Sequence, residues 1–341
     1  GSGSGTLASP LATIQTGINA TSTGDTVLVA AGTYNESVLI SGKNISLISE
    51  KGRDSTIIDA LNISNGRPLT VLNVTDSVKI KGFTLTNGNR SSGVNAFAGG
   101  LYVEGSKGIS LRKLIVDKNT TAGSGGGIGI NSCTYPVTLD SIIISNNKSN
   151  DHGGGLQVIY TDSINVSNLI IKNNTAVNGG GIAIGNLKAN LTNVTVSGNT
   201  ATRDGGGIYS ASSSLTITST EVTDNEGGWG GGFCILFGSA TTGGNSTISN
   251  TLVAKNHGKY HGGGLYIDET KVSLTNVSIT ENTSNEMQGA GIHARNNSNI
   301  ELVNVIHWNN EPSSVVFQED GAKSEISISN SDIEGGQSGV T

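Results

Sequence analysis

The stretch that decides the fold is residues 205–225, which read GGGIYSASSSLTITSTEVTDN. Apolar side chains alternate with polar ones around Ile208, Leu215, Ile217 and Val222, and polar turns separate these runs. Alternation with a period of two is typical of strands, and no helical period of 3.6 residues competes with it. The stretch therefore predicts three short strands separated by turns.

This stretch is one copy of a repeat that opens on a glycine triplet. Triplets start at Gly125, Gly153, Gly179, Gly205, Gly230 and Gly262, with near-copies at Ala98 and Gly289. Successive starts are 27, 28, 26, 26, 25, 32 and 27 residues apart. A fixed period of this size is typical of solenoids, in which each coil buries its apolar face only against its neighbours. We expect an all-β fold, a single-stranded parallel β-helix with three short strands per coil.

An asparagine recurs near the end of each copy and has a structural explanation. The members of this row are Asn119, Asn147, Asn174, Asn199, Asn225, Asn256, Asn282 and Asn309. Stacked asparagine side chains at a turn can hydrogen-bond to one another and to the turning backbone. The row therefore predicts an asparagine ladder rather than a catalytic site.

The two ends of the chain differ from the regular repeats, which run from about 98 to 310. Residues 1–8 read as a linker or a cloning scar, and residues 9–341 as one β-helix domain. Ser9-Pro10 followed by Leu11, Ile14 and Ile18 predicts a capping helix over 9–20, with Ser9 as N-cap. The last coil, near Ile326, looks incomplete, so we expect the native chain to continue beyond Thr341.

Composition excludes several functional classes. The net charge is −6 and Lys and Arg form no run, which argues against nucleic-acid binding. No apolar segment is long enough to span a membrane. Cys133 and Cys234 fall four repeats apart, about 19 Å at a coil spacing of ~4.8 Å, so we expect two free thiols.

Two family resemblances follow from these residues. Residues 24–34, GDTVLVAAGTY, resemble the opening coil of secreted right-handed β-helix proteins of the pectate-lyase-like superfamily. The pairing of asparagine and glycine triplet from Ala98 to Asn309 is similar to the repeat of chlamydial polymorphic membrane proteins, which are surface adhesins. The resemblance implies a right-handed β-helix that is secreted or displayed on the cell surface. No acidic cluster with an Arg pair matches a lyase site, so no catalytic residue is carried over.

Two rows of side chains beside the glycines predict a binding face. Exposed aromatic rings beside polar groups suit sugars, which offer apolar ring faces and hydroxyl edges. Strand alternation predicts that Tyr209 and Tyr266 face outward. The opposing interpretation is that these turn positions tolerate any polar residue and that the rings pack sideways on one another. The candidate ligand-binding residues are Tyr209, Trp229, Tyr260, His261, Tyr266 and His293.

The same rows offer weaker candidates for catalysis. Asp151, His152, Arg203 and Asp204 could supply an acid, a base and a cation for a polysaccharide lyase or glycoside hydrolase. Such residues on the flank of a β-helix are also common as solvated turn residues. The histidines of these rows lie coils apart, so we predict no metal site and no cofactor.

Three functions remain open from the sequence. The first is a secreted or cell-surface module, monomeric and adhesin-like, that binds an extracellular polysaccharide or glycan along one face. The second is an enzyme acting on extracellular polysaccharide. The third is a structural stalk in which the face binds nothing.

Overall fold

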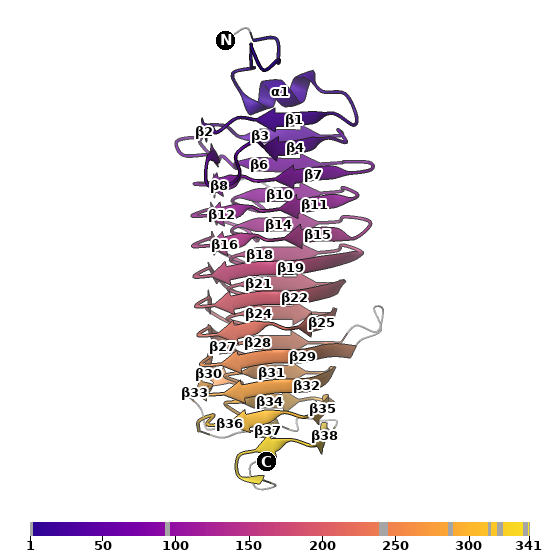
Figure 1. Cartoon of the computed structure of the whole chain (residues 1–341). Helices are drawn as coiled ribbons and strands as arrows, with labels where there is room; N and C mark the ends of the chain where they lie inside the picture. The colour runs from indigo at the N-terminus through magenta and orange to yellow at the C-terminus, as the bar shows by residue number, and fades with distance from the viewer. Residues whose placement is uncertain are drawn as a thin grey trace.

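The chain folds into an all-β parallel β-helix, a solenoid with three sheets (Figure 1). The computed structural model describes residues 3–92, 96–238, 245–285, 289–312, 315–318, 323–336 and 340. Within these residues the only helix is α1 (Ile14–Ala20), at the N-terminal end of the stack. Among the same residues, no helix has both the length and the apolar character needed to cross a membrane.

The first sheet receives one strand from each coil and has 11 strands in the described chain. Neighbouring strands are parallel, as where Ala183 of β21 lies between Gln157 of β18 and Tyr209 of β24. Its strands are β3 (Val38–Ser41), β6 (Leu69–Leu72), β10 (Leu101–Glu104), β14 (Ile128–Asn131), β18 (Leu156–Ile159), β21 (Ile182–Gly185), β24 (Ile208–Ala211), β28 (Phe233–Leu236), β31 (Leu265–Asp268), β34 (Ile292–Arg295) and β37 (Val315–Gln318).

The second sheet has 20 strands among the described residues, because most coils contribute two short strands and four coils a single strand of 10 residues. Its strands are β1 (Thr26–Val29), β2 (Gly32–Tyr34), β4 (Ser46–Ser49), β5 (Thr56–Asp59), β7 (Val78–Lys81), β8 (Thr84–Thr86), β11 (Ile109–Arg112), β12 (Ile115–Asp117), β15 (Val137–Asp140), β16 (Ile143–Ser145), β19 (Ser163–Lys172), β22 (Lys188–Ser197), β25 (Ser214–Thr218), β26 (Glu221–Thr223), β29 (Asn245–Ala254), β32 (Lys271–Thr280), β35 (Asn299–Val303), β36 (Ile306–Trp308), β38 (Glu325–Ser329) and β39 (Asp332–Ile333).

The third sheet has eight short strands in the described chain and follows the asparagine row. Its strands are β9 (Asn89–Arg90), β13 (Thr120–Thr121), β17 (Lys148–Ser149), β20 (Thr175–Ala176), β23 (Thr200–Ala201), β27 (Glu226–Trp229), β30 (His257–His261) and β33 (Thr283–Ser284). The three sheets enclose one continuous apolar core, which extends from Ile14 to Ile333 and is built by alternate strand residues.

The glycine triplets allow close approach of neighbouring coils. Gly179 has φ +65°, in the left-handed region that favours glycine. A Cβ built on Gly180 would lie only 2.6 Å from the carbonyl oxygen of Gly206, one coil away. Side chains are therefore excluded here, and the triplet fixes where each coil enters the first sheet.

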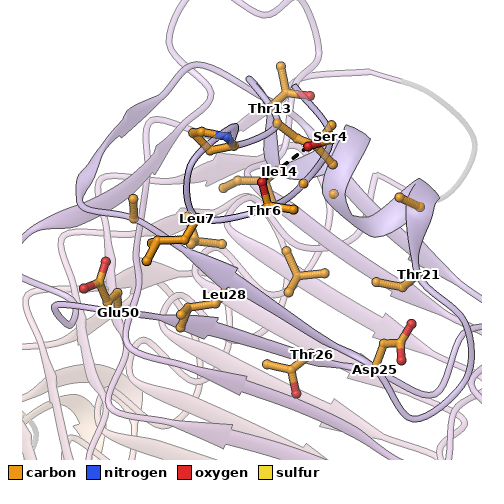
Figure 2. A pocket seen from close by; sticks show the side chains of 18 of the residues that line it. Ser4, Thr6, Leu7, Thr13, Ile14, Thr21, Asp25, Thr26, Leu28 and Glu50 are labelled. Carbon is orange, nitrogen blue, oxygen red and sulfur yellow. Dashed lines mark hydrogen bonds between the residues drawn. The ribbon is translucent and has the colours of Figure 1, made fainter. Parts of the chain in front are cut away.

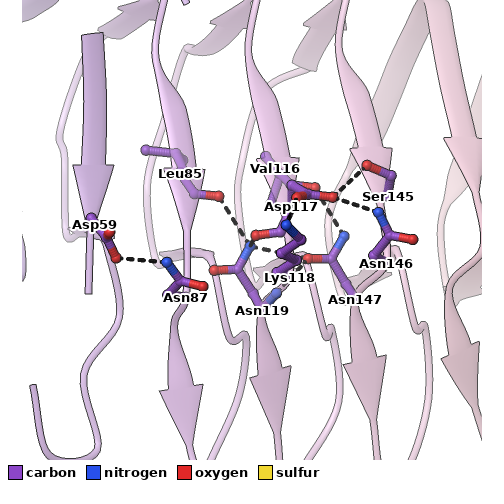
Figure 3. A network of polar contacts seen from close by, with 10 residues as sticks. All are labelled: Asp59, Leu85, Asn87, Val116, Asp117, Lys118, Asn119, Ser145, Asn146 and Asn147. Carbon is purple, nitrogen blue, oxygen red and sulfur yellow. Dashed lines mark hydrogen bonds and ion pairs between the residues drawn. The ribbon is translucent and has the colours of Figure 1, made fainter. Parts of the chain in front are cut away.

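The asparagine ladder forms as predicted for seven of its eight residues, Asn119 to Asn282. Figure 3 shows its start, where Asn119 Nδ2 donates to Asn147 Oδ1 over 3.0 Å and to the carbonyl oxygen of Leu85. The last rung was predicted wrongly, because Asn282 Nδ2 donates to Asn310 Oδ1 (2.9 Å) and Asn310 is buried. Asn309 is exposed, and its backbone N–H donates to the Glu334 carboxylate.

The helix begins later than the sequence predicts. Thr13, not Ser9, is the N-cap of α1, and its Oγ1 accepts from the backbone N–H of Thr16 over 3.1 Å. The Glu36 carboxylate accepts from the backbone N–H groups of Ile14 and Gln15. Because Glu36 belongs to the first coil, this bond holds the helix start at Ile14. Gly5, in the predicted linker region 1–8, donates its backbone N–H to the carbonyl oxygen of Ser9 over 3.0 Å.

Candidate functional site

The residue before each glycine triplet stacks on its counterpart in the next coil. We call this row the pre-glycine column; its described members are Phe97, Ser124, His152, Asn178, Asp204, Trp229 and His261. The backbone of Gly179 donates to the carbonyl oxygen of Asp204 over 2.8 Å, and the equivalent bond recurs in the adjacent coils. Trp229 pairs with Asp204 on one side and with His261 on the other. The predicted register is therefore confirmed, and these side chains share one side of the molecule.

A second row lies on the first sheet, at the second residue of each strand from β10 to β34. We call it the outward column; its members are Tyr102, Gly129, Gln157, Ala183, Tyr209, Cys234, Tyr266 and His293. Tyr209 is half-buried, but Tyr266 is only 4% exposed and His293 is fully buried. Tyr266 lies on the outer side of the sheet, as predicted, but it is not exposed to solvent as a binding face requires. The chain entering each triplet crosses the outer face of the sheet, and a Cβ built on Gly179 would lie 2.9 Å from the Ala183 Cβ.

The aromatic residues of both columns pack on one another around β27, β30 and β31. The Trp229 ring stacks on Tyr266 with centroids 6.3 Å apart and leans on Tyr260 at 5.7 Å. His293 lies between His261 (4.6 Å) and Tyr266 (5.4 Å). Burial raises the pKa of Tyr266 to about 12, so its hydroxyl stays protonated.

This aromatic cluster presents few of its rings to solvent. Tyr260 is 47% exposed, whereas Trp229 and His261 are half-buried. Tyr266 and His293 support these rings from below and lie out of reach of a ligand. The sideways packing that was the opposing interpretation of the sequence is therefore present, and Tyr260 with Trp229 forms the accessible part.

A pocket of about 130 Å³ opens on the first sheet two coils before the aromatic cluster. Its floor is Ala183, the small member of the outward column between Gln157 and Tyr209. The Tyr209 ring packs edge-on against His152, with centroids 5.8 Å apart. Burial is the main cause that raises the pKa of Tyr209 to about 12, so the phenol offers a hydrogen-bond donor. The pocket thus combines an aromatic wall, an amide and an imidazole.

A chain of hydrogen bonds fixes the His152 ring beside this pocket. Ser124 Oγ donates to Asp151 Oδ2 over 2.8 Å, and Asp151 Oδ1 lies 2.7 Å from His152 Nδ1. A carboxylate only accepts, so Nδ1 carries a proton. Nε2 lies 3.2 Å from Asn178 Nδ2, whose amide oxygen accepts from the backbone N–H of Asp204. In the neutral ring, Nε2 therefore accepts from Asn178.

Arg203 and Asp204 form the other half of the predicted catalytic set. Arg203 Nη2 lies 3.9 Å from Asp204 Oδ2, and Asp204 is only 5% exposed. Burial raises the pKa of Asp204, while the charges of Arg203 and His152 act in the opposite direction. Asn178 connects this pair to His152, so the structure brings all four candidates into one polar row along the pre-glycine column.

This row is better arranged for positioning than for acid–base catalysis. Of the four candidates only His152 lines the pocket, and both of its ring nitrogens already have protein partners. A pair of carboxyl groups flanking a substrate, as glycoside hydrolysis needs, is not formed by Asp151 and Asp204, since neither lines the pocket. Within the described part of the chain, no three His, Cys, Asp or Glu side chains gather as a metal site.

Sequence reasoning missed Gln157 and Ala183. Both stand in the outward column, but neither side chain is aromatic or charged, so neither was predicted as a site residue. The available signal was the small side chain at Ala183 between two long neighbours.

A larger cavity, of about 620 Å³, lies at the N-terminal end (Figure 2). It is bounded by the N-terminal residues, α1 and β1, and its lining includes the exposed side chains of Leu7 and Leu28. Its two carboxylates, Asp25 and Glu50, lie on opposite sides (Figure 2), and the cavity is remote from both columns in the stack. The pocket at Ala183 is therefore the better candidate site, although it is smaller.

Comparison with known proteins gives one family match. A model of the Chlamydia polymorphic membrane protein repeat matches residues 193–211. The match is to a repeat. It spans the end of β22, the ladder residue Asn199, a glycine triplet and β24. No curated protein sequence matches significantly.

Several solved structures have a similar fold. The catalytic unit of the GH87 α-1,3-glucanase from Streptomyces thermodiastaticus is 12% identical with a TM-score of 0.44; the match covers 91% of this chain and 64% of the glucanase chain. The A-module of the mannuronan C-5 epimerase AlgE4 from Azotobacter vinelandii is 13% identical with a TM-score of 0.44, covering 94% and 90%. Pectate lyase Pel9A is 13% identical with a TM-score of 0.38, covering 96% and 74%. The expected resemblance to the chlamydial repeat is confirmed by the family match, and the likeness to these solved structures is one of fold alone.

Proposed function

We propose that this chain is an extracellular module that binds carbohydrate on the outer face of its first sheet. The observation that carries the proposal is the pocket on Ala183, walled by the Tyr209 ring and lined by the polar groups of Gln157 and His152. A sugar ring packs its apolar face on an aromatic ring and bonds its hydroxyls to amide and phenol groups, which Gln157 and Tyr209 supply here. Tyr260 and Trp229 supply a second contact farther along the same face.

Filling the pocket tests this function directly. Ala183→Leu would occupy the floor of the pocket and should abolish binding on a glycan array. Thr195→Leu, on the outer face of the second sheet, is the matched control and should bind as the unmodified protein does. Binding that survives in Ala183→Leu would refute the pocket as the site.

The aromatic cluster has a separate test. Tyr260→Ala and Trp229→Ala should each weaken binding of long oligosaccharides more than of short ones, because only a long ligand reaches from the pocket to this cluster. If the unmodified protein, Tyr260→Ala and Trp229→Ala all bind long and short oligosaccharides with equal affinity, the aromatic cluster is not part of the binding site.

A second candidate function is polysaccharide cleavage by a lyase or hydrolase. The Asp151–His152 contact of 2.7 Å beside the pocket favours it, because a carboxylate that orients an imidazole is a common general-base arrangement. Incubation with polysaccharides, followed by absorbance of unsaturated ends and by reducing-sugar release, should show turnover that His152→Gln abolishes. If no polysaccharide of the panel is cleaved or bound, the structural stalk remains as the only one of the three functions.

We also infer that the coils are right-handed and that α1 caps the N-terminal end. Crossovers between parallel strands are right-handed in about 98% of cases. Ile14 and Ile18 of α1 are buried against the first coil. A secreted or surface location and a monomeric state complete the proposal. Removal of residues 3–20 should expose the first coil and give aggregation in light scattering.

A further inference from the structure

The pocket has a charge bias that narrows its ligand class. None of the ten described residues that line it is Lys or Arg. Arg203, the cation adjacent to the pre-glycine column at this level, already lies 3.9 Å from Asp204. Sites that bind carboxylate or phosphate groups present free Arg or Lys side chains to them. The lining of this pocket presents none.

Two carboxylates stand beside the pocket. The Asp151 side chain is 52% exposed and holds His152 in place. Asp204 is 95% buried, and its Oδ1 has no hydrogen-bond partner among the described residues. Both would repel an anionic ligand, and the chain as a whole carries a net charge of −6.

The pKa of Tyr209, whose ring forms the wall of the pocket, reflects the local electrostatic environment. Burial raises the pKa of Tyr209 to about 12; the Asp204 carboxylate adds to this rise and the Arg203 guanidinium opposes it. The surroundings therefore disfavour negative charge on the Tyr209 hydroxyl. A carboxylate brought to the same wall by a ligand meets the same burial and the same Asp204 charge.

We propose that the pocket selects neutral sugars and excludes uronic acids. The inference rests on the proposed carbohydrate binding and names its ligand class. A neutral sugar offers what the lining can satisfy, since its hydroxyls both donate and accept hydrogen bonds. The protonated Tyr209 hydroxyl and the Gln157 amide are complementary to such groups, and the His152 ring packs beside Tyr209.

The test compares ligands that differ in charge only. Oligogalacturonate and its fully methyl-esterified form, at equal length, are titrated into the protein by calorimetry beside a panel of neutral gluco- and chito-oligosaccharides. We expect some of the neutral sugars to bind. The affinity for oligogalacturonate should be at least tenfold weaker than that for its methyl ester, a difference of about 1.4 kcal/mol in binding free energy. Asp204→Asn should reduce the ratio of ester affinity to uronate affinity about threefold, and 0.5 M salt should reduce this ratio by a similar factor. Glu221→Gln, the same charge change on the second sheet, is the control and should leave it unchanged.

The outcomes separate the two proposals. Uronate affinity equal to or above that of the ester would overturn the charge selection while leaving carbohydrate binding intact. A difference that Asp204→Asn and Asp151→Asn both leave unaltered would also overturn it, because the carboxylates would then not be its cause. No binding of any sugar would refute the carbohydrate function and this inference with it.

Discussion

Replacing one asparagine of the ladder should destabilise the solenoid strongly and locally. In the centre of the ladder, Asn199 Nδ2 donates to the carbonyl oxygen of Ile171 and to Asn225 Oδ1, both over 3.0 Å. Its Oδ1 accepts from the backbone N–H and the side-chain amide of Asn174, again over 3.0 Å. Asn199 itself is fully buried, so water cannot replace these bonds.

The size of the effect of Asn199→Ala follows from the groups left without a partner. These are the backbone N–H and one amide N–H of Asn174 and the carbonyl oxygen of Ile171. Asn225 Oδ1 keeps the bond from the backbone N–H of Asn199, over 3.0 Å. At roughly 1–2 kcal/mol for each of the three buried groups, the free energy of unfolding should fall by about 4 kcal/mol.

The assay needs local as well as global resolution, because a solenoid can lose single coils. Denaturant unfolding followed by circular dichroism gives the midpoint, and native-state hydrogen exchange locates the loss around Ile171 to Asn225. Asn190→Ala is the matched control, since Asn190 bonds only to Asn165 Oδ1 (2.8 Å) at the exposed surface. Its cost should stay below about 0.5 kcal/mol. Equal midpoints for the two variants would refute the ladder as a stabilising element.

Three further outcomes are expected. Asn310→Ala should lower the unfolding midpoint clearly more than Asn309→Ala, because only Asn310 accepts from Asn282; the reverse order would contradict the register of the last rung. Burial lowers the pKa of His307 from 6.5 to about 4, so between these pH values only the unfolded state takes up the proton. The free energy of unfolding should therefore fall as the pH decreases, by about 2 kcal/mol at pH 5. His307→Leu should remove this part of the pH dependence of denaturation, and an unchanged slope between pH 7.5 and 5 would contradict it. Cys133 and Cys234 are free and buried, and burial raises the pKa of both thiols, so they should react with a thiol reagent only on unfolding; fast labelling of the native protein would contradict their burial.

The regular part of the fold was readable because the coil repeats one set of contacts. The glycine triplet and the ladder asparagine each mark a position that admits few other residues, so their spacing gives the register. The prediction was wrong where two neighbouring residues could both occupy the same position in the ladder. Asn309 and Asn310 are adjacent asparagines, and spacing alone does not decide which side chain turns inward.

The helix start was unreadable for a different reason. Ser9-Pro10 is a strong local signal for an N-terminus, and Thr13 is another. The carboxylate of Glu36, from the first coil, satisfies the N–H groups of Ile14 and Gln15. A contact between residues so distant in the sequence decides between the two caps, and local propensity carries no information about it.

The two columns of the proposed binding face were predicted in their position but not in their exposure to solvent. Alternation along a strand places Tyr266 and His293 on the outer side of the sheet, which is correct. It cannot tell that the glycine triplet of the same coil packs against them: a Cβ built on Gly289 would lie 3.0 Å from the His293 Cβ. Of the predicted site residues, Asp204, Tyr266 and His293 are therefore buried beneath the surface, and the open pocket lies at Ala183.

A small residue in the outward column is necessary for such an opening but does not suffice. Gly129 is smaller than Ala183, yet the space above it is taken, because a Cβ built there would lie 3.0 Å from the Ala98 Cβ. Ala183 instead stands between the long side chains of Gln157 and Tyr209, which rise on either side and leave a hollow. The proposed ligand site lies where the outward column is interrupted, so the small side chain of Ala183 specifies the pocket as much as the side chains of Gln157 and Tyr209 do.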